Sequence, residues 1–191
     1  GDYFNTLKFA RKFQTLYPKN ENIAYIDFLI AMTFYEQVQI VARDQTYTKA
    51  ALKEFKNIIE KYPNSKYAKE SRLKIDLIDE QLAGKHMYLA RFYMKKSKWI
   101  SAIRRLNIIL EDYPETIYTI ETLHRLVEIY YKLGNISLAK KYAATLGYNF
   151  NDSDWYKKTY KVVVDQNYES DTKKTKIKLR DKIKNILKLS K

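Results

Sequence analysis

The dipeptide Tyr-Pro occurs three times at the end of an amphipathic stretch, at Tyr17-Pro18, Tyr62-Pro63 and Tyr113-Pro114. When the copies are aligned on the proline, apolar or small residues occupy the positions 12, 11, 8 and 5 residues upstream: Thr6, Leu7, Ala10 and Phe13, then Ala51, Leu52, Phe55 and Ile58, then Ala102, Ile103, Leu106 and Ile109. This spacing places one apolar stripe on a helix, which ends at the proline because proline cannot continue the hydrogen-bonded turn. The sequence therefore predicts three copies of one helix.

Two segments also follow the tetratricopeptide pattern, in which two helices form each repeat. The matching residues are His86, Leu89, Ala90 and Tyr93, followed by Ala102, Leu106 and Pro114; and Leu123, Leu126, Val127 and Tyr130, followed by Gly134, Asn135, Ala139 and Ala143. Small side chains at Ala102 and Ala139 let the two helices of a repeat cross closely. The predicted fold is an all-α, tetratricopeptide-like helical-repeat solenoid with elongated helices.

The prolines are 45 and 51 residues apart, which exceeds the repeat length of about 34 residues. We therefore expect additional helix over 23–42 and over 65–82, the latter running on through Gly84 to near Lys96. A capping helix that contains Trp155 is expected to close a repeat domain over 1–165. Gly1-Asp2 stands where a turn between helices is expected, so the first repeat of this domain is expected to be missing.

Composition argues against an enzyme. The chain has no cysteine, which excludes thiol nucleophiles and thiolate metal sites, and its two histidines, His86 and His124, are 38 residues apart. It contains neither a Gly-rich phosphate loop nor a His-Glu-x-x-His motif. Four glycines and three prolines are also too few for the many turns of a strand-rich fold. We expect a non-enzymatic protein without a cofactor or a metal.

The formal net charge is +14, and 28 of the 36 basic residues are lysine. Solvated lysine faces are the favoured interpretation, with an acidic partner as the alternative. Residues 166–191 form a distinct basic tail, in which Leu179, Ile183, Ile186 and Leu187 recur at helical spacing. Such an amphipathic segment fits a frayed end, a partner contact or a lipid surface.

The order of segments resembles the BamD (ComL or YfiO) lipoprotein family of the outer-membrane β-barrel assembly machine, in its alphaproteobacterial branch. The resemblance rests on seven segments in order, at residues 35–37 with 43–45, 61–68, 82–85, 90–93, 111–116, 123–128 and 146–150. It implies a periplasmic scaffold, tethered to the inner face of the outer membrane of a Gram-negative bacterium by a lipidated cysteine. Because this chain has no cysteine, it resembles an N-terminally truncated piece without the lipid anchor.

The resemblance also implies partners. In the family, the N-terminal repeats are implicated in receiving unfolded outer-membrane proteins, and the C-terminal half docks on the periplasmic POTRA domains of BamA, beside other assembly-machine lipoproteins. Arg105 matches the family's basic docking position and is expected to pair with an acidic group of the partner; Arg104 and Asp112 complete the expected partner-binding set. The alternative is a solvated or intramolecularly paired arginine.

A second surface follows from the repeat pattern, because first helices line the concave side of such repeats. The expected groove residues are Met87, Arg91, Met94, Lys95, Glu121, His124, Glu128 and Tyr131. Polarizable methionine and amphipathic tyrosine suit varied extended segments. The alternative is that Met87, Met94 and Tyr131 pack between repeats. Arg43 and Asp44 are expected to form a structural ion pair at a helix end.

Two other functions remain open. A generic tetratricopeptide adaptor of the Tol-associated type shares the Tyr-Pro-x-Ser phrase, although such proteins keep more regular spacing. A nucleic-acid-binding helical repeat would use the positive charge and the aromatic residues. The family resemblance favours an assembly-machine scaffold without nucleic acid as a partner.

Overall fold

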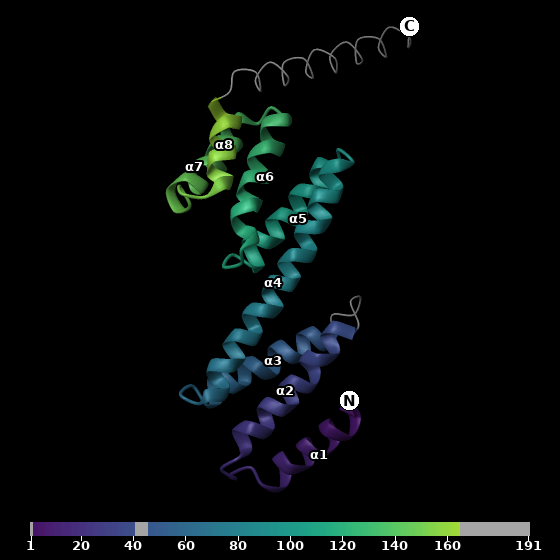
Figure 1. The fold of residues 1–191 in the computed structure, drawn as a ribbon. Helices are drawn as coiled ribbons and strands as arrows, with labels where there is room; N and C mark the ends of the chain where they lie inside the picture. The colour runs from purple at the N-terminus through teal and green to yellow at the C-terminus, as the bar shows by residue number, and fades with distance from the viewer. Residues whose placement is uncertain (1, 41–45, 165–191) are drawn as a thin grey trace, which may run out of the picture. The chain divides into compact units, whose positions relative to one another are not determined.

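The structure of the chain is a computed structural model that describes residues 2–40 and 46–164. These residues form eight α-helices and no strand (Figure 1). The helices are α1 (Tyr3–Leu16), α2 (Ile23–Ile40), α3 (Thr46–Lys61), α4 (Lys66–Lys95), α5 (Trp99–Asp112), α6 (Tyr118–Lys132), α7 (Ile136–Asn149) and α8 (Asp154–Val164). Helices that follow one another pack in pairs, so the predicted all-α, tetratricopeptide-like repeat is confirmed.

The three Tyr-Pro motifs end three helices in the same way. The backbone N–H groups of Tyr17, Tyr62 and Tyr113 donate to the carbonyl four residues earlier, at 2.8, 2.9 and 3.0 Å. The next residue in each copy is proline, which has no N–H to extend the ladder. The prediction of three copies of one helix is therefore confirmed.

The predicted extra helices are also present. Helix α2 covers most of the expected range 23–42, and α4 runs without interruption through Gly84 as far as Lys95. Helix α8, which carries Trp155, is the expected capping helix. Arg43, Asp44 and the tail over 166–191 lie outside the described residues.

The chain divides into two compact units, Gly1–Gln81 and Leu82–Lys191, with the boundary inside α4. In the first unit, Phe55 of α3 is fully buried against Phe28 and Tyr35 of α2, with ring centroids 6.1 Å apart in both pairs. Tyr62 also donates a hydrogen bond to the buried carboxylate of Asp27 at 3.1 Å. These contacts fasten α3 to α2.

The core of the second unit alternates large and small side chains from α4, α5 and α6. Its buried members are Ala83, Met87, Ala90, Ala102, Leu106, Ile109, Leu126 and Ile129. A neighbouring cluster joins Val127 and Tyr131 of α6 to Ala139 of α7. Ala102 and Ala139 are fully buried, which is what close helix crossing at these positions requires. The core fixes the position of α6, whose polar residues belong to the candidate site.

None of the helices in the described parts of the chain combines the length and the apolar character needed to cross a bilayer.

Candidate functional site

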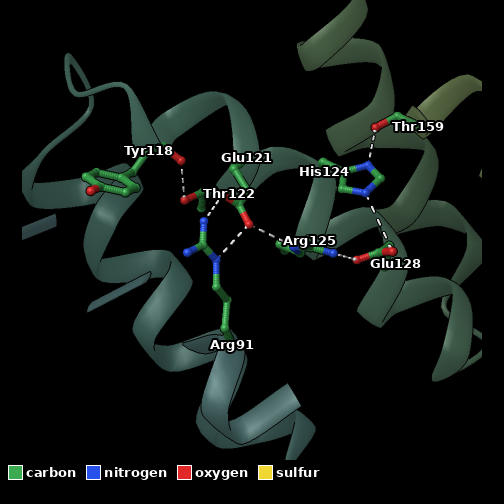
Figure 2. A network of polar contacts seen from close by, with 8 residues as sticks. All are labelled: Arg91, Tyr118, Glu121, Thr122, His124, Arg125, Glu128 and Thr159. Carbon is green, nitrogen blue, oxygen red and sulfur yellow. Dashed lines mark hydrogen bonds and ion pairs between the residues drawn. The ribbon is translucent and has the colours of Figure 1, made fainter. Parts of the chain in front are cut away.

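The carboxylate of Glu121 on α6 is the centre of a polar network in the second unit (Figure 2). Its Oε1 accepts hydrogen bonds from Arg91 Nε of α4 at 3.0 Å and from Arg125 Nε at 3.1 Å, and its Oε2 accepts from Arg91 Nη2. Burial by itself raises the pKa of Glu121, but the hydrogen bonds and charges of the two arginines outweigh burial and lower it. Glu121 is therefore ionised at neutral pH and joins α4 to α6.

Helix geometry assembles the rest of the network on α6, because residues three and four apart are neighbours on a helix. Arg125 Nη1 donates to Glu128 Oε2 at 2.8 Å, and His124 Nε2 lies 3.5 Å from Glu128 Oε1. Burial opposes ionisation of Glu128, yet the hydrogen bonds and charges of His124 and Arg125 lower its pKa to about 2. Glu128 thus also carries its charge at neutral pH.

The network continues to α8 through the buried ring of His124. His124 Nδ1 forms a hydrogen bond with Thr159 Oγ1 at 2.7 Å, and both side chains are almost fully buried. The His124 ring also lies 5.1 Å from the ring of Trp155. Arg125 and Lys158 place their cationic groups 5.1 and 4.1 Å from the Trp155 ring centroid, which the negative face of the indole favours. Helix α8 is therefore fastened to α6 by polar and aromatic contacts.

The network has a cationic outer edge above the buried carboxylate of Glu121. The side chains of Arg91 and Arg125 are 52% and 26% exposed, whereas that of Glu121 is 5% exposed. In residues 2–40 and 46–164, no group of three or more acidic or histidine side chains is placed to hold a metal ion. The arrangement positions three helices and presents two arginines whose orientation is fixed.

A second surface lies on α5, where two of the predicted partner-binding residues come together. Burial lowers the pKa of His86, the charges of Arg105 and Lys85 lower it further, and the charge of Asp112 opposes them, so these side chains share one neighbourhood. The His86 ring stacks on Tyr113 with centroids 6.1 Å apart. Arg105 is half-buried and, within the described residues, forms neither a hydrogen bond nor an ion pair. Arg104 is exposed on the same helix.

The eight expected groove residues occupy three kinds of position. Arg91, Glu121, His124 and Glu128 belong to the network around Glu121. Met87 and Tyr131 are buried in the two core clusters, and Met94 is half-buried against the first of them, which is the packing role that the alternative interpretation expected. Lys95 is exposed at the end of α4. The network is therefore the part of this set that forms one structural group.

Three members of the site were not among the predicted residues. Arg125 connects both glutamates, and its spacing from Glu121 and Glu128, four and three residues, is a signal that the sequence carries. Trp155 and Thr159, four residues apart, share one face of α8. Their contact with His124 depends on how α8 packs on α6, which sequence spacing does not specify.

Comparison with known proteins adds independent findings. Residues 1–146 match the model of the YfiO family, described as an outer membrane lipoprotein. The chain is 40% identical over 170 residues to the outer membrane protein assembly factor BamD of Rickettsia prowazekii, covering 89% of this chain and 67% of that protein. It is 39% identical over 165 residues to BamD of Caulobacter vibrioides, and the alignment covers 86% of this chain and 54% of that protein.

A relative with lower sequence identity also aligns with most of this chain. BamD of Pasteurella multocida is 30% identical over 158 residues, with 78% of this chain and 61% of the relative aligned. The chain therefore spans between about half and two thirds of the length of these three relatives. The matched region 1–146 includes α5 with Arg105 and the α6 network, whereas α8 lies beyond it.

Proposed function

Because the chain belongs to the YfiO family of outer membrane lipoproteins, we propose that it is a scaffold in the assembly of outer-membrane proteins. The family match confirms the resemblance inferred from the seven ordered segments. The matched relatives are assembly factors and not enzymes, in agreement with the composition of this chain. The family description, outer membrane lipoprotein, supports a lipid-anchored position at the outer membrane, and the periplasmic face is part of the proposal.

The observation that carries the proposal is the extent of the match. It runs through α1 to α6 and most of α7, and it includes α4, α5 and α6, which carry Arg91, Arg105 and Glu121. A scaffold acts by holding partners in fixed geometry, which raises their effective concentration without chemistry of its own. The hydrogen bonds that join Glu121 of α6 to Arg91 of α4 supply rigidity of this kind in the second unit.

The proposed partner surface is the face of α5 around Arg105, with the POTRA domains of BamA as the partner. Arg105 is half-buried and forms no hydrogen bond within the described residues, so an acidic group of the partner would complete its hydrogen bonding. Arg104 and Asp112 extend this surface along the helix. Arginine at a partly desolvated position is a frequent source of binding energy in protein interfaces.

The exposed edge of the network around Glu121 suits the partners other than BamA that the family resemblance implies. Arg91 presents its cationic group on α4, and we assign to this edge contacts with unfolded outer-membrane proteins or with other lipoproteins of the assembly machine. Hydrogen bonds to Glu121 hold the Arg91 guanidinium group in place, so it meets a partner in a fixed orientation.

The test is a calorimetric titration of this chain with the soluble POTRA region of BamA from the same organism. The proposal expects saturable binding with one site per chain, weaker at high salt because an ion pair contributes. Circular dichroism of the same sample establishes that the chain is folded and helical. A folded chain that gives no binding heat, and no change in the mobility of the POTRA region, would contradict docking on BamA.

A further inference from the structure

Lysines gather at the end of the second unit where α4 meets α5 and where α6 ends. Lys95 is the last residue of α4, Lys96 follows it in the turn, Lys98 precedes α5, and Lys132 is the last residue of α6. Lys132 Nζ lies 5.1 Å from the ring centroid of Trp99 at the start of α5, so the two helix ends are adjacent. Figure 1 shows the α4–α5 connection and the end of α6 at the same end of this unit. We call Lys95, Lys96, Lys98 and Lys132 the lysine tip.

The lysine tip is exposed and lacks neighbouring acidic residues in the sequence. All four lysines are exposed, and residues 93–101 and 129–137 contain neither aspartate nor glutamate. Glu128, one turn before the end of α6, is already engaged by Arg125 and His124. The four positive charges are therefore directed to solvent without a carboxylate from either segment.

The turn that carries three of these lysines has a fixed backbone. Ser97 has a φ of 57°, and the N–H groups of Ser97 and Lys98 donate to the carbonyls of Met94 and Tyr93, both at 2.9 Å. These are the bonds that close a helix with a left-handed residue after it. The lysines are thus held together by the fold rather than by chance proximity on a flexible loop.

Apolar side chains protrude among the same lysines. Ile100 is 61% exposed in the first turn of α5, and Leu133 is 43% exposed directly after Lys132. Trp99 is half-buried, and the ammonium group of Lys132 lies over its ring. Lysine combined with exposed aliphatic residues and a tryptophan is typical of protein surfaces that meet the interface of a lipid bilayer.

We propose that the lysine tip docks on a bilayer surface that contains anionic phospholipids. The lysines attract lipid phosphates, and Ile100 and Leu133 enter the headgroup region beside them. A bilayer is the favoured anionic surface because the apolar residues are interspersed with the charges and the family is one of outer membrane lipoproteins. The proposal goes beyond docking on BamA, since Arg105 lies seven residues, or about 10 Å of helix, from Lys98.

The experiment is sedimentation of the full chain with vesicles of phosphatidylethanolamine, with and without phosphatidylglycerol. The test variant is K95Q/K96Q/K98Q, and the matched control is K49Q/K53Q/K69Q, which removes three exposed lysines from the first unit. Each lysine near an anionic bilayer strengthens binding by about fivefold. Partitioning onto anionic vesicles should fall roughly a hundredfold in the test variant and much less in the control.

Tryptophan fluorescence reports the contact independently. Trp99 is the remaining tryptophan in Trp155→Phe, and Trp155 is the remaining one in Trp99→Phe. Lipids brominated near the headgroup should quench Trp99 in the first variant more strongly than Trp155 in the second. Ile100→Ser should weaken binding of the otherwise unchanged chain, because an apolar side chain no longer enters the interface.

Three results would overturn the proposal. Equal losses in the test and control variants would mean that net charge alone attracts the chain to vesicles. Unchanged binding by K95Q/K96Q/K98Q would assign the contact to another part of the chain. Retention on soluble polyglutamate with no binding to anionic vesicles would indicate an acidic protein partner instead. Titration of the same variant with the POTRA region should give unchanged affinity, so failure here is distinguishable from failure of docking on BamA.

Discussion

Arg91 of α4 and Glu121 of α6, 30 residues apart in the sequence, are joined by two hydrogen bonds from one guanidinium group to one carboxylate. The pair is asymmetric, because the arginine side chain is half-exposed while the glutamate is almost fully buried. A buried carboxylate that loses its donors cannot recover them from water. The carboxylate of Glu121 therefore depends on its two donors, Arg91 and Arg125, to stay buried in its charged form.

Replacement of Glu121 by alanine should lower the free energy of unfolding by about 2 kcal/mol. Removal of one partner of a buried ion pair generally lowers the free energy of unfolding by more than this amount. The expected loss is smaller here because Arg91 and Arg125 can turn partly to solvent. Arg91→Ala should cost less than Glu121→Ala, because Arg125 Nε still donates to Glu121 Oε1. Urea denaturation followed by circular dichroism measures both. Lys157→Ala, which breaks an exposed pair with Asp154, is the control and should change stability by less than about 0.5 kcal/mol.

Stability should fall as the pH is lowered from about 5 to about 2, in part through Glu128. Its pKa is lowered to about 2 in the folded chain, whereas an unfolded glutamate has a pKa near 4.5. The unfolded chain therefore binds the proton first, and the stabilisation that is present above pH 5 is lost as Glu128 is protonated. After discounting for solvent screening, this residue accounts for about 2 kcal/mol. Denaturation at several pH values should show a smaller loss in Glu128→Gln; an identical loss would contradict the assignment.

Gly147→Ala should destabilise the chain, although alanine normally favours a helix by about 1 kcal/mol over glycine. A Cβ at this position on α7 would lie 2.8 Å from Cε2 of the Tyr156 ring on α8. The ring has to move, and we expect a net loss of about 1 kcal/mol. In a Tyr156→Ala background the same substitution should become stabilising. Thermal denaturation of the four proteins measures the coupling, and additive effects would contradict close packing of α7 on α8.

Tyr62→Phe should lower stability by about 1 kcal/mol, because it removes the hydrogen bond to the buried carboxylate of Asp27. Tyr17 is the matched control in another copy of the Tyr-Pro motif, and its ring is more than half exposed. Tyr17→Phe should be almost neutral. Equal effects of the two substitutions in urea denaturation would show that the Asp27 contact contributes nothing specific.

The helices could be predicted from the sequence because their signals are local. Proline after Tyr62 or Tyr113 ends a helix wherever the chain goes next, and the apolar stripe upstream defines which face is buried. The same reasoning predicted that α4 would pass through Gly84, since a single glycine weakens a helix without ending it. These features depend on a few neighbouring residues and not on the tertiary arrangement.

The site could be predicted only in part, because its contacts link distant helices. The repeat pattern placed Arg91 and Glu121 on first helices, but their pairing depends on the crossing of α4 and α6. The contact of His124 with Thr159 likewise depends on the packing of α8. At Arg105 the family resemblance indicated the residue, whereas its proximity to His86 follows from how α5 lies against α4.

The central claim, docking on BamA through α5, is tested most directly by titrating Arg105→Ala and a matched arginine variant with the POTRA region. Arg72→Ala is the control, because Arg72 is an exposed arginine in the first unit. We predict that Arg105→Ala weakens binding at least about tenfold, as loss of an interface arginine commonly does, while Arg72→Ala stays within about twofold of the unaltered chain. Equal affinities of Arg105→Ala and the unaltered chain would contradict the claim.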